Sequence, residues 1–540
     1  MAPESEAATS AVSASRTWVA TGTGLVLDVP AHRFQDGRVS TKQRIGLVLS
    51  PALALALLLF GDLDPGDPAV TRMAAVAVLM AGWWITEAIP IPATALLPVA
   101  LFPILGIMRG RDVAGVYFNH VIFLFIGGFL LALAMQKWDL HRRIALRIIL
   151  LLGTGRKRLM LGFMVATWFL SMWISNTATT MMMVPMALAI TIQLKRSLDG
   201  RLSGRYATGL LIGVAYAASI GGIATLIGTP PNLSFVRILK IVFPAAPEIS
   251  FASWFFFAFP LSLVFLMIAW AVLVRMFAPR GAAPAERSDL IREEHRKLGP
   301  LRYEEGMILG LFSLLVLLWM FRSDIAIGTF TIPGWTRIMP VPEAIDDGTV
   351  AIAVALLLFI LPSRTEPKQR LLDWRTAREL QWGIVLLFGG GFALASGFKE
   401  SGLSEWLGGR LTGLGGLPPI AIILTVCGGL TFLTELTSNT ATTEMILPVL
   451  GSLGVATGIN PLLLMVPATL SASCAFMLPV ATPPNAIVFG SGEVRIADMV
   501  RSGIVLNLIG IGLIALSVTL LGTWILGIDP NTVPDWASIR

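Results

Sequence analysis

Two short polar motifs each occur twice in a strongly apolar chain, and they are the residues best suited to bind small ions. Residues 175–185 read SNTATTMMMVP, and residues 438–448 read SNTATTEMILP. A second motif, Thr-Pro-Pro-Asn, begins at Thr229 and again at Thr482. Serine, threonine and asparagine offer hydroxyl and amide oxygens to a cation, and hydroxyl and amide hydrogens to an anion. The motifs therefore predict sites for a small cation and for an anionic group.

The proline pairs add backbone groups to this chemistry. Proline lacks an N–H and clashes with the preceding turn, so a helix stops before it. The break leaves free carbonyl oxygens upstream, which suit a small cation. It also leaves free N–H groups at the positive end of the next helix, which suit a carboxylate. The predicted substrate-binding residues are Ser175, Asn176, Thr177, Thr229 and Pro230 in the first half, and Ser438, Asn439, Thr440, Thr482 and Pro483 in the second.

The spacing of the motifs indicates that the chain contains a duplicated half. Asn439 lies 263 residues after Asn176, and the same offset places residues 125–129 (FIGGF) on residues 388–392 (FGGGF). The two Thr-Pro-Pro-Asn copies are 253 residues apart. A single Ser-Asn-Thr in a membrane helix more often joins helices, and a lone proline more often makes a kink. Two copies of each motif, in the same order, favour a binding site.

Two such half-sites, if they meet, would hold a substrate with two carboxylates. No Lys or Arg lies in or beside the four motifs, and the nearest are Lys195 and Arg237. Bound cations are therefore expected to neutralise the dianion, and they would couple its transport to their own.

Carboxylates flank only the second Ser-Asn-Thr motif. Glu435 and Glu444 lie within apolar sequence, and Met172 and Met181 occupy the matching positions in the first half. An intramembrane carboxylate is by default a functional hypothesis. Glu435 is predicted to orient the loop of the cation site. Glu444 is predicted to face a watery vestibule or to pair with a cation from a loop.

The composition places these motifs in a helical membrane protein. The chain has 540 residues and only 14% are charged, little more than half the usual share for a soluble protein. Many continuous apolar runs are long enough to cross a bilayer, and their continuity excludes a transmembrane β-barrel. The net charge of +7 lies in loops, which favours cytoplasmic loops over nucleic-acid binding. Cys427 and Cys474 lie in apolar segments and are expected to be buried thiols.

The predicted fold is all-α, with about eleven transmembrane helices and two re-entrant helical hairpins. The hairpins are predicted at 158–194 and 417–455, because each stretch is too long for one plain helix and is interrupted by Ser-Asn-Thr. Each Thr-Pro-Pro is expected to break a further helix. The predicted spans are 44–60, 71–88, 91–107, 119–137, 206–242, 252–278, 304–321, 349–363, 382–398, 462–492 and 499–527.

Loop charge predicts the orientation of these elements. Acidic loops at 62–67 and 324–347 are expected outside the cell. The N-terminus is then cytoplasmic, the C-terminus lies outside, and the two hairpins enter from opposite sides, as in inverted-repeat transporters. The basic loops expected on the cytoplasmic side are 137–158, 195–205, 280–302 and 364–378.

Two segments that follow equivalent spans are predicted to be lateral helices along the membrane surface. They are 138–153, which has a basic and an apolar face, and 401–416. Ordinary connecting helices are the alternative.

These motifs resemble the divalent anion–sodium symporter family, which includes sodium-coupled dicarboxylate and citrate transporters. The resemblance covers roughly residues 44–528, and residues 478–486 (LPVATPPNA) are similar to the family's signature sequence. It implies a homodimer whose protomers each have a scaffold domain and a transport domain that slides like an elevator, carried by the lateral helices. It also implies a small dianionic carboxylate as substrate and Na⁺ as the coupling ion, with no organic cofactor.

The resemblance also implies two sodium sites. Ser171 and Thr434 occupy matching positions before each Ser-Asn-Thr, 263 residues apart. Glu444 departs from the family pattern, which has a small or apolar residue there. The implied ligands are Ser171, Ser175, Asn176 and Gly228 at the first site, and Thr434, Thr437, Asn439 and Ala481 at the second.

The implied domains follow the two halves. The transport domain would comprise 154–278 and 417–528, joined to the scaffold by the lateral arms. The remaining expected segments are a cytoplasmic N-terminal tail (1–43), scaffold helices of the first half (44–137), a cytoplasmic linker with the second set of scaffold helices (279–400), and a C-terminal tail outside (529–540).

The favoured function is Na⁺-coupled import of C4-dicarboxylates such as succinate, malate and fumarate across a bacterial inner membrane. A sodium-independent dicarboxylate exchanger could share these motifs, and citrate or sulfate are alternative substrates. A membrane enzyme is a rival class, but the sequence has no HExxH, GxSxG or CxxC motif, and none of its four His residues neighbours the repeated motifs. A channel, the third class, would conduct without saturation.

Overall fold

The computed structural model describes residues 18–20, 26–28, 40–153, 155–197, 200–278, 288–327, 330–410, 418–530 and 532–537. These residues are almost entirely helical, as the apolar sequence predicts. Two small antiparallel hairpins pair β1 (Trp18–Ala20) with β2 (Val26–Asp28), and β3 (Ile325–Ile327) with β4 (Phe330–Ile332). Most of the predicted N-terminal tail, residues 279–287 of the predicted linker and residues 411–416 of the predicted second arm lie outside the described residues.

The helices of the first half alternate between long apolar rods and short connecting pieces. They are α1 (Thr41–Phe60), α2 (Pro68–Thr86), α3 (Ile91–Thr94), α4 (Leu97–Ile104), α5 (Gly110–Tyr117), α6 (His120–Lys137), α7 (Leu140–Leu152), α8 (Arg156–Ser171), α9 (Asn176–Ser197), α10 (Gly200–Ile223), α11 (Pro230–Val242) and α12 (Phe251–Phe277).

The second half repeats this order after an amphipathic linker helix. Its helices are α13 (Ser288–Lys297), α14 (Tyr303–Met320), α15 (Asp347–Ile360), α16 (Trp374–Ala377), α17 (Trp382–Glu400), α18 (Leu403–Arg410), α19 (Pro419–Thr434), α20 (Asn439–Ala456), α21 (Leu462–Ala472), α22 (Pro483–Gly490), α23 (Ile496–Ser517) and α24 (Thr523–Ile525). Short 3₁₀ turns at Trp335–Ile338, Pro342–Ala344 and Asp535–Ala537, and a π-helical turn at Val518–Gly522, complete the described elements.

Eight helical stretches of the described chain are long and apolar enough to cross a membrane. The other three predicted spans, 91–107, 349–363 and 462–492, form shorter helices. The first is divided at residues 95–96, just before Pro98, which has no N–H to continue the helix. The predicted number of eleven spans is therefore not confirmed, although the apolar character of each segment is.

The four predicted breaks occur where the polar motifs stand. The helices of the first hairpin, α8 and α9, are separated at residues 172–175, and those of the second, α19 and α20, at residues 435–438. α11 begins at Pro230 and α22 at Pro483, each with proline at its first helical position. Proline fits there because the first N–H groups of a helix have no partner in the helix.

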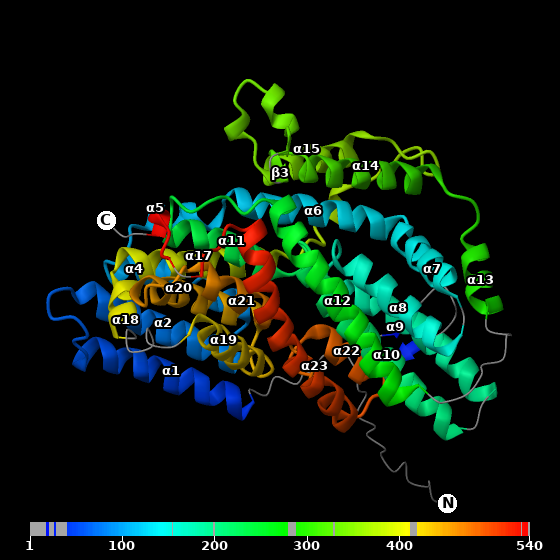
Figure 1. Cartoon of the computed structure of the whole chain (residues 1–540), viewed down its shortest axis with the longest axis horizontal. Helices are drawn as coiled ribbons and strands as arrows, with labels where there is room; N and C mark the ends of the chain where they lie inside the picture. Colours follow the sequence, from blue (N-terminus) through cyan, green and yellow to red (C-terminus); the bar gives the residue numbers. More distant parts are fainter. Residues whose placement is uncertain are drawn as a thin grey trace, which may run out of the picture.

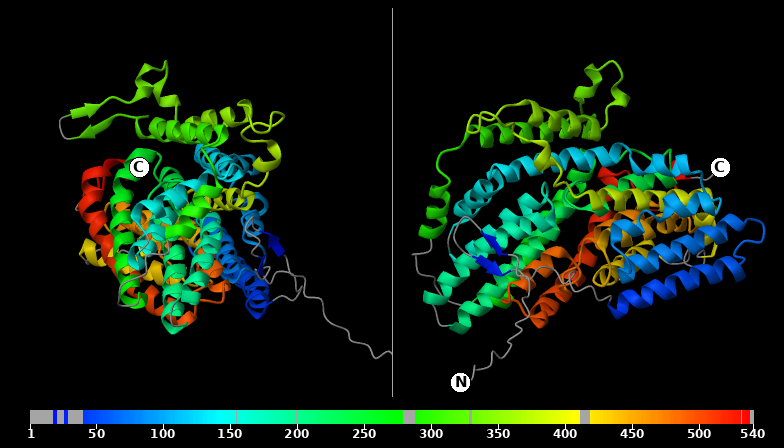
Figure 2. Two further views of the ribbon diagram at one scale, coloured as in Figure 1. Left: turned by 90° about the vertical axis from the view of Figure 1, so that its right-hand side faces the viewer. Right: turned by 180° about the vertical axis from the view of Figure 1, so that it is seen from behind.

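Figure 1 shows how the two halves lie together. α14 and α15 form a layer over α6, and the left view of Figure 2 shows the β3–β4 hairpin projecting beyond that layer. The hairpins and the broken helices pack in the body of the molecule beneath it. The pairing is crosswise, because α11 of the first half packs against α20 of the second, and α22 packs against α9.

The predicted first lateral segment is a separate helix, α7, that is anchored to the linker. Arg143 is buried and donates through Nε and Nη2 to the two carboxylate oxygens of Glu305, each at 2.9 Å. Its guanidinium also donates to carbonyl oxygens at the end of α13, including Gly299 at 2.9 Å. A guanidinium held by two carboxylate oxygens is geometrically specific, so the position of α7 relative to α13 and α14 is well defined.

Candidate functional site

The first half-site is formed where the tip of the α8–α9 hairpin meets the break between α10 and α11. Ser171, fully buried at the end of α8, donates from Oγ to Asn176 Oδ1 at 2.5 Å. A Cβ placed on Gly222 would lie 2.7 Å from Asn176 Oδ1 and 3.1 Å from the carbonyl oxygen of Gly228. These oxygens therefore converge beside Gly222, where only a residue without a side chain fits.

The second half-site repeats the contact between the hydroxyl and the motif asparagine. Thr434 Oγ1 lies 2.5 Å from Asn439 Oδ1, as the matching Ser171 does from Asn176, and 3.0 Å from the carbonyl oxygen of Ala472. Thr437 Oγ1 donates to Leu433 O at 2.9 Å, so this hydroxyl lies at the hairpin tip.

The breaks in the two long helices are held open by asparagine in the same way. Asn232 Nδ2 donates to the carbonyl oxygens of Gly222 and Thr225, at 3.2 and 2.7 Å. Asn485 Nδ2 donates to Ala475 O and Leu478 O, at 3.1 and 3.0 Å.

The carbonyls of Gly222 and Thr225 match those of Ala475 and Leu478 at the 253-residue offset. The two loops are therefore held by equivalent hydrogen bonds. The sequence analysis predicted no role for either asparagine, although each is the repeated fourth residue of a Thr-Pro-Pro-Asn motif. In both side chains Oδ1 is buried and has no hydrogen-bond partner among the described residues.

The other predicted residues surround these contacts. Ser175 Oγ accepts from the amide of Ala178 at 3.2 Å and so caps α9, while Ser438 makes no side-chain cap. Thr482 Oγ1 accepts from the amide of Asn485 at 3.3 Å. Thr229, Thr440 and Ala481 are buried, Thr177 and Pro230 are half-buried, and Pro483 is exposed.

The contacts of Glu435 agree with its predicted role of orienting the loop of the cation site. Its carboxylate accepts from the amides of Phe476 at 2.7 Å, Met477 at 2.8 Å and Leu478 at 3.0 Å, and from Asn507 Nδ2 at 2.8 Å. Four donors satisfy a buried carboxylate without a counter-cation. Glu435 therefore ties the hairpin tip to the unwound loop, as expected.

In the first half a backbone carbonyl, not a carboxylate, ties the hairpin tip to the unwound loop. The hydroxyl of Thr225 donates to Met172 O at 2.5 Å, and Met172 is the residue that matches Glu435.

The hypothesis that Glu444 faces a watery vestibule or pairs with a loop cation is wrong. Its side chain is fully buried where α20 meets α11 and α17. One carboxyl oxygen accepts from Ser234 Oγ at 3.0 Å, and the other has no hydrogen-bond partner in the described structure. The apolar sequence around Glu444 gave no sign of Ser234, which is 210 residues away.

The residues predicted to bind ion and substrate are themselves neutral and rich in oxygen. Within the described residues, no Lys or Arg donates a hydrogen bond to the predicted site residues, and no group of three or more His, Cys, Asp or Glu could hold a metal ion. Hydroxyl, amide and carbonyl oxygens are ligands that hard cations accept. The donor set therefore fits Na⁺, and Ala481 would contribute its carbonyl because it has no polar side chain.

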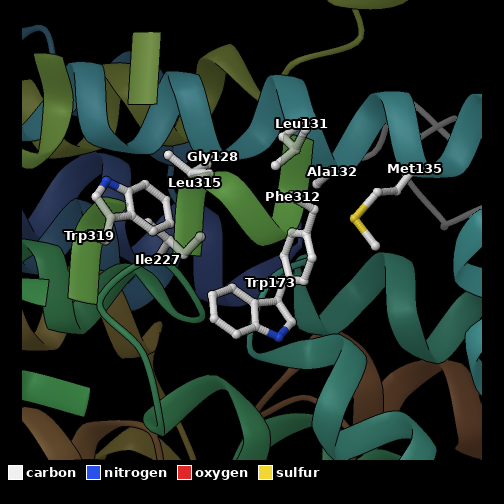
Figure 3. A pocket seen from close by; sticks show the side chains of 9 residues that line it. All are labelled: Gly128, Leu131, Ala132, Met135, Trp173, Ile227, Phe312, Leu315 and Trp319. Carbon is white, nitrogen blue, oxygen red and sulfur yellow. The ribbon is translucent and has the colours of Figure 1, made fainter. Parts of the chain in front are cut away.

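An apolar pocket closes over the tip of the first hairpin. It lies between α6, α14 and the tip, and Figure 3 shows its side chains facing one another. Because the lining is apolar, apart from the indole nitrogens, this pocket is not the anion site. It is lined by Gly128, Leu131, Ala132, Met135, Trp173, Ile227, Phe312, Leu315 and Trp319.

Comparison with known proteins agrees with this geometry. The sequence profile described as "Sodium:sulfate symporter transmembrane region" matches residues 43–528. The sodium-dependent dicarboxylate transporter SdcS of Staphylococcus saprophyticus is 44% identical over 510 residues, which cover 92% of this chain and 95% of the relative. The protein of the same name from Staphylococcus aureus strain MRSA252 is 44% identical over 506 residues, covering 91% and 94%.

Solved structures with a similar fold are also membrane transporters. Neisseria gonorrhoeae MtrF, of a class of antimetabolite efflux pumps, superimposes with a TM-score of 0.53 at 12% identity, covering 90% of this chain and 100% of its own. The Alcanivorax borkumensis YdaH transporter gives a TM-score of 0.51 at 14% identity, with coverages of 85% and 99%. At these identities the likeness concerns the fold alone.

Proposed function

The chain belongs to the sodium:sulfate symporter family, and we propose that it imports C4-dicarboxylates such as succinate, malate and fumarate together with Na⁺. One observation carries the proposal: two matching neutral half-sites interlock crosswise through α11 on α20 and α22 on α9. Two half-sites fit a substrate with two carboxylates. The names of the staphylococcal relatives specify sodium and a dicarboxylate, which agrees with this chemistry.

The residues of each half-site have separable roles in this proposal. Ser171, Ser175, Asn176 and Gly228 would hold one Na⁺, and Thr434, Thr437, Asn439 and Ala481 a second. Bound Na⁺ supplies positive charge that offsets the substrate's negative charge. No organic cofactor is part of the proposal.

The substrate would lie between the two cations. Its carboxylates would receive hydrogen bonds from the amides and hydroxyls of the two Ser-Asn-Thr motifs and from Thr229 and Thr482. Those threonines are the N-cap residues of α11 and α22, so the positive ends of the two helix dipoles would face the anion. The fixed prolines Pro230 and Pro483 hold these helix starts in place.

Movement in this proposal is that of an elevator. Residues 154–278 and 417–528 would slide as a transport domain against scaffold helices 44–137 and 279–400. The arms at 138–153 and 401–416 would join the two, and the scaffold would pair with a second copy of the chain. The membrane would be the bacterial inner membrane, with the N-terminus cytoplasmic and the C-terminus outside.

Uptake of labelled succinate into proteoliposomes tests the proposal. Vesicles with an inward Na⁺ gradient are compared with the same vesicles in K⁺, each with and without an inside-negative potential. Na⁺-dependent uptake is expected, and it increases with the potential if more positive charge than substrate charge crosses. Uptake that does not depend on Na⁺ but requires internal dicarboxylate would show that the protein is an exchanger and not a symporter. If succinate is not taken up, labelled citrate and sulfate test the other dianion classes in the same vesicles.

A further inference from the structure

Glu444 is buried at a contact between the proposed transport domain and the proposed scaffold. It lies on α20, five residues after Asn439, and accepts a hydrogen bond from Ser234 on α11. On the opposite side it packs against α17, where a Cβ on Gly391 would overlap its carboxyl group. Its second oxygen points into this contact and has no partner among the described residues.

No counter-charge compensates a carboxylate at this position. In the described chain Glu444 forms no ion pair, and one hydroxyl is its hydrogen-bond donor from another helix. An unpaired ionised carboxylate in such a dry contact is so unfavourable that the group takes up a proton instead. Glu435 shows the contrast within the same helical hairpin, because four donors surround its carboxylate.

The ionisable groups of the surrounding helices have other partners or lie elsewhere. The Tyr117 hydroxyl on α5 donates to Ala95 O at 2.5 Å, and Lys399 on α17 donates to Ile241 O at 3.0 Å. Arg237, one turn after Ser234 on α11, is half-buried; its Nε has no hydrogen-bond partner among the described residues, and it has no ion pair with Glu444. The other ionisable residues on helices packed against α20 are Arg72 (α2), Lys240 (α11), Glu400 (α17), Glu405 and Arg410 (α18) and Cys427 (α19).

The two halves of the chain differ at this contact, which supports its assignment to one position of the proposed transport domain. Gly128 and Gly391 occupy matching positions on α6 and α17, yet they meet residues that do not match. A Cβ on Gly128 would lie 3.1 Å from Ile227 Cδ1, whereas Gly391 meets Glu444. Met181, which matches Glu444, is 59% exposed.

The opposite position of the proposed transport domain can be inferred by giving each half the contacts that the other half has in this structure. In an inverted-repeat transporter one body rocks or slides against the other around a fixed site, so each half can adopt the surroundings of its counterpart. Gly391 would then meet Val480, the match of Ile227, and Gly128 would meet Met181. Glu444 would leave the dry contact and become as exposed as Met181 is here.

We propose that Glu444 is a proton-binding site whose occupancy is linked to the position of the transport domain. The proton is bound when α20 lies against α17, and it is released to water when the contact opens. Acid therefore favours the arrangement described here, and alkali favours the opposite one. This inference rests on the proposed sliding movement and adds a proton, at a position away from the Na⁺ and substrate residues, to the groups that set its equilibrium.

Distances between two spin labels test the linkage on the full-length protein in lipid nanodiscs. One label is placed at Ile338, 81% exposed in the β4–α15 loop, and one at Arg495, whose side chain is 80% exposed at the start of α23. The buried thiols Cys427 and Cys474 are replaced by alanine so that only the two labels react. Distance distributions are recorded from pH 6 to pH 9, with Na⁺ and succinate and without them.

Wild type is expected to show two distance populations whose ratio changes with pH, by at most about tenfold per pH unit for one proton. The Glu444→Gln variant keeps the shape of the side chain without its ionisation, and Glu444→Met copies the first-half residue. Both variants should retain the population favoured by acid at every pH. Glu400→Gln, at an exposed carboxylate on α17, is the matched control, and it should keep the pH-dependent ratio.

Three results would contradict the linkage. A wild-type ratio that does not change with pH, while Na⁺ and succinate do change it, overturns the role of Glu444 and leaves the proposed transport movement standing. A pH-dependent ratio that persists in both Glu444 variants assigns the proton to another group. A single distance under all conditions overturns the movement and the inference together.

Discussion

The tips of the two hairpins have nearly the same sequence but different surroundings. Trp173 and Ile227, at the first tip and its neighbouring loop, are 7% and 5% exposed, and the Trp173 ring meets Phe312 of α14 edge to face at 4.9 Å. The matching residues of the second half, Leu436 and Val480, are 63% and 81% exposed.

The polar contacts at the two tips nevertheless agree, down to the 2.5 Å contact with the motif asparagine. The duplication has therefore preserved these polar contacts, while the packing around them differs between the halves. Such a difference is what one end of a sliding movement would produce in a protein with two equivalent half-sites.

The largest expected effect tests whether the two half-sites are equivalent in use. Asn176→Ala and Asn439→Ala each remove the amide oxygen that contacts Ser171 or Thr434. Each variant should reduce succinate uptake by about 100-fold, because interactions with charged ligands are worth about 1.5–3 kcal/mol. Uptake is measured in proteoliposomes and folding by gel filtration. Full uptake in either variant would remove that asparagine from the site, and a loss in one only would break the equivalence.

The next effect concerns how each hairpin tip is tied to its loop. Glu435→Ala leaves three backbone amides and the Asn507 side chain without an acceptor. The variant should lose about 3 kcal/mol of stability, because buried unsatisfied donors are costly. In the first half the tie is one hydrogen bond from the Thr225 hydroxyl to Met172 O, so Thr225→Val, which removes it with little change in volume, should lose clearly less. Thermal unfolding in detergent measures the stability of both variants. Equal losses of stability would show that the contacts between tip and loop contribute equally in the two halves.

A third test exchanges the apolar residues of the two tips. Trp173→Leu places the second-half residue in the aromatic contact of the first tip and should cost about 2 kcal/mol, because it leaves a cavity. Leu436→Ala, at the exposed second tip, should cost under about 0.5 kcal/mol, as surface substitutions usually do. Thermal unfolding again measures both changes. A larger loss for Leu436→Ala would mean that the second tip is covered by a part of the assembly outside this chain.

The smallest effect compares the ends of the matching helices α6 and α17. Lys137 at the end of α6 lies 2.6 Å from Asp373, and this hydrogen bond, with the amide of Thr376, lowers the pKa of Asp373 to about 2. The carboxylate therefore stabilises the fold above its ordinary pKa of about 4, and the contribution is lost as pH falls toward 2.

Asp373→Asn should cost under about 1 kcal/mol at pH 7, because the pair is partly exposed, and the difference from wild type should shrink below pH 4. Glu400 matches Lys137 and has no ion pair among the described residues, so Glu400→Gln is the control. A pH-independent difference for Asp373→Asn would mean that the ion pair contributes nothing.

The sequence predicted most of this architecture because its strongest signals are local. Proline at Pro230 and Pro483 determines where two helices begin, and the repeated Ser-Asn-Thr marks both hairpin tips. The family resemblance implied Ser171 and Thr434 as sodium ligands, and each of these hydroxyls contacts the asparagine of its motif.

The errors concern contacts between distant parts of the chain. The burial of Glu444 depends on Ser234 and Gly391, which no local pattern connects to it. The number of full-length spans depended on whether proline-rich segments such as 91–107 stay continuous, and hydropathy does not determine this.

The crosswise packing of α11 on α20 and of α22 on α9 has a consequence for the making of this protein. About 250 residues separate the end of α11 from the end of α22. At 5–20 residues per second, the first half must wait roughly 10–50 s in the membrane before its partner helices emerge from the ribosome. During that time the unwound loop held by Asn232 has no second half beside it. The newly made first half is thus the stage of synthesis at which this protein is most exposed to misfolding and to quality-control proteases.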